Sequence, residues 1–163
     1  MNRGSLMIMV YSNFSESLRD NVTSIFEQSE GFRILVSDGI ILDYAFTEKL
    51  RRMNGFIQRI LTSHQIVRIM GDGSNMDSCM IIRSSILDDW GKENSDYFLD
   101  TLPLWPGQNG TKVFLFLVGA PSPLVRMNHT MGIAFYADKQ GGEKLQWGET
   151  ARRQGRLLSR WEK

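Results

Sequence analysis

Cysteine and histidine are scarce in this chain of 163 residues, and their scarcity excludes several kinds of chemistry. Cys79 is the single cysteine, so the chain forms no intramolecular disulfide and no cysteine-cluster metal site. The two histidines, His64 and His129, lie far apart and lack the spacing of a metal-binding motif. The sequence therefore predicts no metal and no cofactor.

Long apolar runs are also missing. No run approaches the roughly 18–20 residues that a membrane span needs, so we expect no membrane span. The apolar run at residues 6–11 is too short for the core of a secretory signal peptide, and no small-residue cleavage site follows it. These features predict a protein that is cytoplasmic or otherwise intracellular.

An excess of charge of one sign is the third absence, because the formal net charge is +1. Binding to a polyanion would therefore depend on a local basic patch and not on the field of the whole molecule. With 42% hydrophobic and 23% charged residues, the composition is that of a globular protein. We expect a single domain over residues 1–163.

Apolar runs and helical spacing predict the elements of the fold. Strands are expected at residues 6–11, 32–36, 40–46, 65–70, 79–83, 113–118 and 131–136, and helices at residues 14–29, 47–63, 88–102 and 147–161. Asp38 and Gly39 form a two-residue turn signal, which predicts a hairpin between residues 32–36 and 40–46. Residues 103–109 hold two prolines and a glycine, a composition typical of an irregular joint.

The order of these elements predicts an α+β fold, a two-layer sandwich with a mainly antiparallel sheet. It matches two ferredoxin-like halves, residues 5–71 (βαββαβ) and residues 77–163 (βαββα), that share a core. A single larger mixed sheet is the alternative. The run at residues 113–118 has no polar break, which indicates a strand covered on both faces and paired with residues 131–136.

Cys79 is a candidate nucleophile if His64 or His129 lies beside it in the fold. A purely structural role is the stronger interpretation, because Cys79 lies in an apolar run where cysteine behaves as a small hydrophobic residue. We therefore assign no catalytic residue.

The loop at residues 71–77 is the most glycine-rich part of the chain. Its polar members are candidates for a phosphate or cation site: Asp72, Ser74, Asn75 and Asp77. No Gly-Lys-Ser/Thr sequence follows, and the spacing fits neither a dinucleotide fingerprint nor an EF-hand loop. A plain turn is the competing interpretation.

The C-terminal segment is rich in arginine. On a helix, Arg152, Arg156 and Arg160 form one ridge, with Arg153 beside it and Trp161 on another face. The arginines are a solvated face, a contact for nucleic-acid phosphates, or a contact for the acidic residues 88–100 of a second copy.

These features favour a non-catalytic binding or assembly protein, self-associating or contacting nucleic acid through the C-terminal arginine helix. The loop between residues 113–118 and 131–136 is the second candidate contact, through Arg126, Asn128 and His129. One alternative is a small-molecule-binding sensor or regulatory domain with a pocket lined by methionine and phenylalanine. The other is an enzyme that acts on a phosphorylated substrate at residues 71–77.

Overall fold

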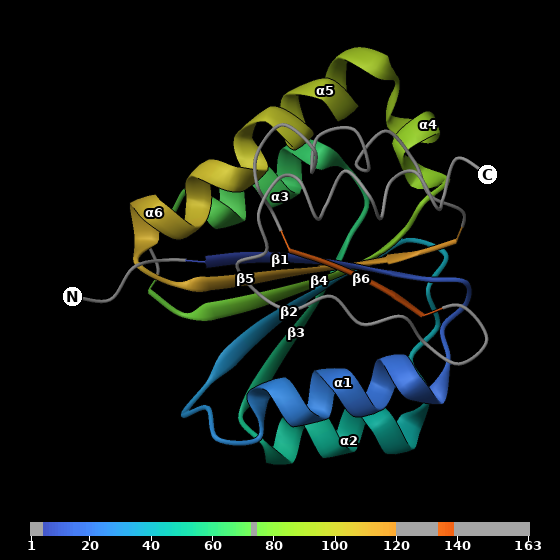
Figure 1. The fold of residues 1–163 in the computed structure, drawn as a ribbon, viewed down its shortest axis with the longest axis vertical. Coiled ribbons are helices and arrows are strands. Elements are labelled where there is room, and N and C mark those ends of the chain that lie inside the picture. The colour runs from blue at the N-terminus through green and yellow to red at the C-terminus, as the bar shows by residue number, and fades with distance from the viewer. Residues whose placement is uncertain (1–4, 73–74, 120–133, 139–163) are drawn as a thin grey trace.

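The computed structural model describes residues 5–72, 75–119 and 134–138, in which strands and helices alternate along the chain (Figure 1). The elements are, in order, β1 (Ser5–Tyr11), α1 (Glu16–Phe26), β2 (Phe32–Ser37), α2 (Tyr44–Arg52), β3 (Gly55–Ile60), α3 (Ser63–Met70), β4 (Asp77–Arg83), α4 (Ile86–Trp90), α5 (Lys92–Thr101), the 3-10 turn η1 (Leu102–Leu104), α6 (Trp105–Asn109), β5 (Lys112–Val118) and β6 (Ala134–Asp138).

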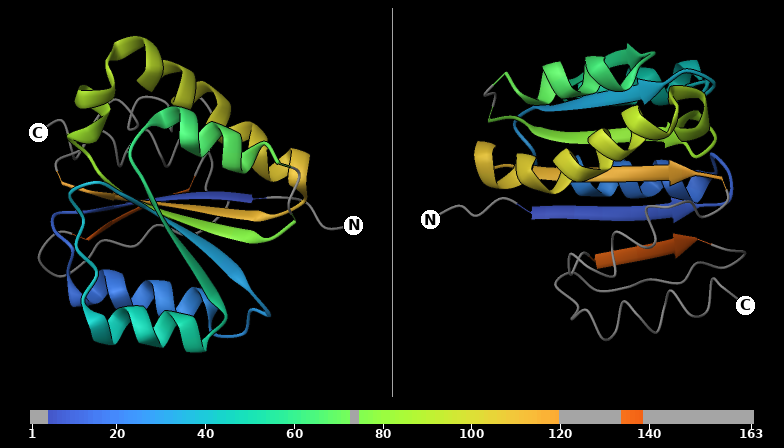
Figure 2. Two further views of the ribbon diagram at one scale, coloured as in Figure 1. Left: turned by 180° about the vertical axis from the view of Figure 1, so that it is seen from behind. Right: turned by 90° about the horizontal axis from the view of Figure 1, so that it is seen from above.

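The strands form one six-stranded sheet in the order β3-β2-β4-β5-β1-β6, and every pairing is parallel. The right panel of Figure 2 shows the strand arrows pointing the same way. The prediction of a mainly antiparallel α+β sandwich with ferredoxin-like halves is therefore wrong. The fold is α/β, with helices in the connections between parallel strands, as parallel pairing requires.

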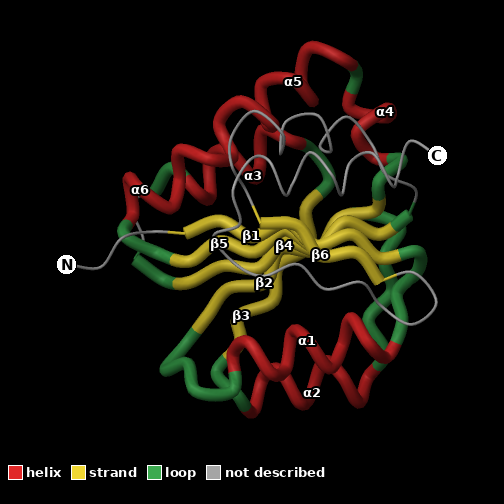
Figure 3. Tube along the Cα trace, in the orientation of Figure 1, coloured by secondary structure: helices red, strands yellow, loops and turns green. Residues whose placement is uncertain are grey.

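Helices cover both faces of the sheet, which makes three layers (Figures 1 and 3). Helices α1 and α2 pack on one face, and α3, α4, α5 and α6 pack on the other. Since both faces of the central strands are covered, β1, β2, β4 and β5 are mainly apolar instead of alternating with polar residues, whereas β3 has several exposed residues. This explains why the apolar runs at β1, β2, β4 and β5 predicted strands correctly from the sequence.

Side chains in register across the sheet show how the two cores are built. Leu35, Met80, Leu115 and Ile8 are aligned on neighbouring strands and belong to the core under α3 and α5. One position earlier on each strand, Ile34, Cys79, Phe114 and Met7 are aligned and belong to the core under α1 and α2. The alternation follows from the two-residue period of a strand.

The predicted hairpin at Asp38 and Gly39 is wrong, although the turn itself exists. Gly39 has a φ of +89°, but the chain then enters α2 instead of returning as a strand. Asp43 caps this helix, because its Oδ1 accepts a hydrogen bond of 2.8 Å from the Phe46 N–H. The expected strand at residues 40–46 is therefore a loop followed by the start of a helix.

Two other elements differ from the sequence prediction. The expected helix at residues 47–63 ends at Arg52, and the chain turns through Asn54, with a φ of +64°, into β3. The expected strand at residues 65–70 is helix α3, which Thr62 and Gln65 open with a complete capping box. β3 pairs in parallel with β2, which removes the basis for a split βαβ half.

The region at residues 113–138 is central, but its strands are not a pair. β5 lies between β4 and β1, as expected for a strand covered on both faces, and β1 separates it from β6. Residues 103–109, predicted to be irregular, form the end of η1 and the short helix α6. The helix predicted at residues 147–161 lies outside the described residues.

Within the described ranges, the helices are all too short or too polar to cross a membrane.

Candidate functional site

A polar pocket of about 330 Å³ opens at the carboxyl ends of β2, β3 and β4. Its volume is at the lower end of the range for small-ligand pockets. Its lining residues come from the end of β4, from the segments that follow β2, β3 and β4, and from α5: Asp38, Leu61, Thr62, Ser63, His64, Arg83, Ile86, Asp89, Trp90 and Asn94.

The pocket lies where neighbouring strands send the chain to opposite faces of the sheet. The chain leaving β2 enters α2 on one face, whereas the chains leaving β3 and β4 enter α3 and α4 on the other face (Figure 1). In open parallel sheets, the crevice at such a reversal is the usual ligand site. The fold therefore marks this edge of the sheet as the candidate functional site.

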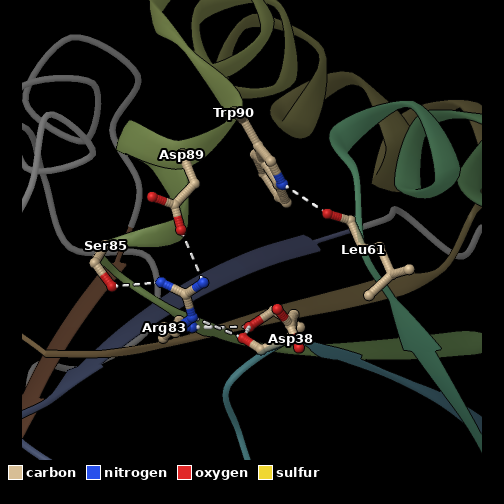
Figure 4. A network of polar contacts seen from close by, with 7 residues as sticks. Asp38, Leu61, Arg83, Ser85, Asp89 and Trp90 are labelled. Atoms are coloured by element: carbon tan, nitrogen blue, oxygen red, sulfur yellow. Dashed lines mark hydrogen bonds and ion pairs between the residues drawn. The ribbon is translucent and has the colours of Figure 1, made fainter.

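Arg83, the last residue of β4, is held in the pocket by three hydrogen bonds (Figure 4). Its Nε donates to the Asp38 carbonyl at 2.8 Å, its Nη1 to Ser85 Oγ at 2.7 Å, and its Nη2 to Asp89 Oδ2 at 2.8 Å. The Arg83 backbone N–H donates to Ser37 Oγ at the end of β2. These contacts fix the orientation of the guanidinium group.

Trp90 forms the opposite wall of the pocket (Figure 4). Its indole N–H donates to the Leu61 carbonyl at 3.1 Å, which ties α4 to the end of β3. Its ring packs edge-on against Phe98, with the ring centroids 5.5 Å apart. Phe98 and Trp105 are core residues, and Tyr97 is exposed, so the aromatic residues of this region divide between core and surface.

Some acidic residues of the segment 88–100 form ion pairs within the chain. Asp89 pairs with Arg83, and Asp96 pairs with Lys92 at 2.6 Å. Asp88, Glu93 and Asp100 are exposed. Only part of the segment is therefore available to a basic partner.

The loop at residues 71–77, predicted to hold a phosphate or a cation, lies at the opposite, amino end of the sheet. Asp72 is 3.4 Å from the guanidinium of Arg33, and Asp77 accepts a hydrogen bond of 2.9 Å from the Lys112 N–H. Asn75 is exposed, and Ser74 lies outside the described residues. Asp72 and Asp77 each contact another part of the chain, and the phosphate or cation site at this loop stays a prediction.

The side chain of Arg33 links this loop to α3 and to the sheet. It is 7% exposed and donates to the Ile69 carbonyl near the end of α3, to Ser78 and to Asp72. A guanidinium beside a helix carboxyl end stabilises the helix dipole. Arg33 thus joins β2, α3 and β4, a role that its place in an apolar run did not reveal.

The proposed pairing of Cys79 with a histidine is not supported by His64. Cys79 is fully buried in the middle of the sheet, whereas His64 is exposed at the carboxyl edge. Burial raises the pKa of the Cys79 thiol well above its usual range because the thiolate is not solvated. His129 lies outside the described residues. In the described part of the chain, no group of three or more metal-ligating side chains is found.

The two predicted contact surfaces fall outside the described residues and stay predictions. The C-terminal set is Arg152, Arg153, Arg156, Arg160 and Trp161, and the loop set is Arg126, Asn128 and His129.

Sequence reasoning missed the pocket residues, although the chain carries a signal for them. Polar residues stand at or just after the ends of β2, β3 and β4, at Ser37-Asp38, Thr62-Ser63 and Arg83-Ser84-Ser85. In a parallel sheet the carboxyl ends share one edge, so such residues meet. The hairpin interpretation of Asp38 and Gly39 placed β2 antiparallel to its successor and hid this pattern.

The connection from β1 to α1 is a second position at which an α/β fold can bind phosphate. Its residues 12–15 contain neither glycine nor lysine, and Glu16 adds a negative charge to the first turn of α1. A phosphate-binding loop uses glycine N–H groups and a lysine at this place. This connection therefore does not have the chemistry of a P-loop.

No protein-family model and no curated protein sequence matches the chain. Among solved structures, the fold is similar to that of an ATP synthase subunit, NeqB, from Nanoarcheaum equitans, with a TM-score of 0.52 and 10% sequence identity. The alignment covers 96% of this chain and 54% of that chain, so this chain spans about half of its structural neighbour. At this identity the likeness concerns the fold alone.

Proposed function

We propose that this chain is a small-molecule-binding regulatory domain whose ligand occupies the pocket at the carboxyl ends of β2, β3 and β4. The observation that supports the proposal is the position of a polar pocket at the point where successive connections turn to opposite faces of the sheet. Arg83 is already oriented there by three partners, which lowers the ordering cost of binding.

The pocket differs from the one expected for a sensor domain. The methionine and phenylalanine residues named for its lining are mostly core residues, and none of them lines the pocket. The lining is polar, with Trp90, Ile86 and Leu61 as the apolar part. The proposal therefore keeps the regulatory function and moves the site from the sheet–helix core to the edge of the sheet.

The indole N–H resonance of Trp90 provides the test. The protein labelled with ¹⁵N is titrated with mixtures of fragments of about ten non-hydrogen atoms, a size matched to the lower end of ligand pockets. The mixtures hold neutral, anionic, cationic and zwitterionic compounds, and Trp90→Phe assigns the resonance. We expect at least one compound to shift Trp90 in a saturable way.

The indole resonance of Trp105, a buried residue that does not line the pocket, is the internal control and should not move. If no fragment shifts Trp90 at millimolar concentration, the proposed function is wrong.

Assembly through the C-terminal arginines is the second proposal, and the spacing of Arg152, Arg156 and Arg160 supports it. The partner is nucleic acid or a second copy. Light scattering at low and high salt, with and without RNA or DNA, tests it. A monomer that ignores salt and nucleic acid contradicts it, and replacement of the three arginines by glutamine should abolish any association.

A further inference from the structure

We propose that the ligand of the carboxyl-edge pocket is a compact zwitterion, an amino carboxylate of the size of an α-amino acid with an apolar side chain. The inference rests on the proposed function, because it names the class of ligand for the same pocket. It follows from two sets of unused hydrogen-bonding groups, one suited to a carboxylate and one suited to an ammonium group.

Ser63 begins the carboxylate-binding set. It is the first residue of α3 and lines the pocket while being only 3% exposed. In the described part of the chain, its hydroxyl has no hydrogen-bond partner, and it is not among the fully enclosed polar atoms, so it is accessible from the pocket. An unpartnered hydroxyl at the wall of a pocket indicates that a ligand or water completes its hydrogen bonding.

The first turn of α3 adds donors beside this hydroxyl. Thr62 Oγ1 already accepts from the Gln65 N–H, so the cap occupies the third N–H of the helix. The N–H groups of Ser63 and His64 come earlier in the turn, where no intrahelical acceptor exists. Together with the positive end of the helix dipole, they favour an anionic group.

Arg83 completes the carboxylate-binding set. A guanidinium has five N–H groups, and three of those of Arg83 are bound by Asp38, Ser85 and Asp89. One N–H on each terminal nitrogen is left without a partner among the described residues. Two such donors suit a carboxylate or a phosphate.

The ammonium-binding set consists of three oxygen acceptors. The Asp38 carboxylate is exposed and has no partner within the described ranges. Asp89 uses Oδ2 for Arg83, and Oδ1 is left for a ligand. Asn94 donates its Nδ2 to the Trp90 carbonyl, which leaves Oδ1 as an acceptor. An ammonium group has three donors for these oxygens.

The charge of the lining selects among the ligand classes. Two carboxylates, Asp38 and Asp89, stand against one guanidinium, Arg83, so the lining carries one net negative charge with His64 neutral. A phosphate would add negative charge to a negative pocket, and a simple amine would leave the carboxylate-binding set empty. A zwitterion adds no net charge and uses both sets.

The apolar part of the lining sets the third property of the ligand. Trp90, Ile86 and Leu61 line the pocket, and Leu61 is 57% exposed without a ligand. An aliphatic side chain that contacts them would remove this apolar surface from water. The volume of about 330 Å³ limits the ligand to a small molecule.

The test compares three probes that share one side chain: L-leucine, its amide and 4-methylpentanoate. Leucinamide lacks the carboxylate, and 4-methylpentanoate lacks the ammonium group. Followed at the Trp90 indole resonance, L-leucine should bind roughly tenfold more tightly than either analogue, because each analogue leaves one set of groups unpaired. Equal binding of the three probes would overturn the proposal.

Two variants test the carboxylate-binding set. Ser63→Ala and Arg83→Lys should each weaken L-leucine binding by roughly tenfold, since lysine keeps the charge and loses the fork. Their effect on leucinamide should be smaller. Arg51→Lys, at an exposed arginine of α2, is the matched control and should bind L-leucine as the unchanged protein does. A Ser63→Ala protein that binds L-leucine with unchanged affinity contradicts the proposal.

Different results would contradict the proposed ligand class and the proposed function. If the fragment mixtures shift Trp90 but the binding compounds are neutral molecules, simple anions or simple cations, the zwitterion class is wrong and the regulatory domain stands. If nothing shifts Trp90, both are wrong.

Discussion

Gly39 shows how one residue type makes the pocket possible. Its φ of +89° is in the region that side chains other than glycine rarely adopt. A Cβ at this position would also lie 2.5 Å from Arg83 Cδ, well inside van der Waals contact. The glycine therefore allows Arg83 to pack across the Asp38–Gly39 backbone and to reach the Asp38 carbonyl.

Gly39→Ala should displace Arg83 and lower the free energy of unfolding by about 1–3 kcal/mol, because it adds both backbone strain and a clash. Urea denaturation followed by circular dichroism measures the loss. Gly107→Ala is the matched control: it lies in α6 with no atom near the added Cβ, and we expect it to be neutral or to stabilise by up to about 1 kcal/mol. Equal stability of the two variants would contradict the close approach.

Cys79 is expected to be unreactive in the folded protein. It is fully buried between the helix layers, and burial raises the pKa of its thiol, so the thiolate is scarce at neutral pH. Iodoacetamide at pH 8 should label native protein slower than denatured protein by about two orders of magnitude or more, because labelling requires opening of the core. Fast labelling of native protein, measured by mass spectrometry, would contradict the buried position.

At the scale of elements, helix α3 shows why a strand-like pattern folds as a helix. Residues 65–70 contain three β-branched residues and resemble a short buried strand. At the start of the helix, the side chains of Thr62 and Gln65 each accept a hydrogen bond from the other residue's backbone N–H. The Leu61 N–H also donates to Gln65 Oε1 at 2.5 Å. With this start, Ile66 and Met70 face the sheet and are buried.

Thr62→Ala should lower the free energy of unfolding by about 1 kcal/mol, since it removes the side-chain acceptor for the Gln65 N–H. Thr62→Ser keeps that acceptor and should lose little stability, which makes it the matched variant. Thermal denaturation of the three proteins measures the difference. A serine variant as unstable as the alanine variant would show that the methyl group matters and the cap does not.

The junction between α2 and β3 shows the converse case, a helix shorter than its pattern. Asn54 has a positive φ, and a Cβ on Gly55 would lie 2.8 Å from the Leu50 carbonyl oxygen and 2.9 Å from the Phe32 ring. The chain needs this close approach to place β3 beside β2. Gly55 lies inside the segment predicted as a helix at residues 47–63, and it is instead the first residue of a strand.

At the scale of the whole molecule, the order of strands decides which part of the sheet is most protected. β5 pairs with β4 and β1 and is covered by helices on both faces, whereas β3 pairs with β2 alone among the described strands. Phe56 on β3 is 62% exposed. β3 is therefore one edge strand of the described sheet, and β6, which pairs with β1, is the other.

Amide hydrogen exchange tests this order. The N–H groups of β5 should exchange only through global unfolding, and those of β3 should exchange faster by roughly tenfold or more, because an edge strand opens locally. Measurement by NMR at neutral pH gives the rates strand by strand. Equal protection of β3 and β5 would mean that another strand or another molecule covers the β3 edge.

The sequence alone predicted the strands β1, β2, β4 and β5, although it missed β3 and predicted strands at residues 40–46 and 65–70 that are not there. The runs at β1, β2, β4 and β5 are apolar at successive positions, and this pattern depends on local composition. Helical spacing likewise predicted a helix at residues 14–29, and α1 begins at Glu16 after Ser15 and buries Leu18, Val22 and Phe26. The single cysteine excluded a disulfide without any structure.

Only the tertiary structure decided which strands are neighbours and whether they run parallel, because the residues of an apolar strand do not indicate the direction of its partner. Asp38 and Gly39 have the chemistry of a hairpin turn, yet the helix that follows them makes β2 and β3 parallel. Parallel pairing brings Arg83, Ser63 and Asp38 to one edge from three separate parts of the chain. The pocket is thus a product of long-range pairing, which local patterns do not encode.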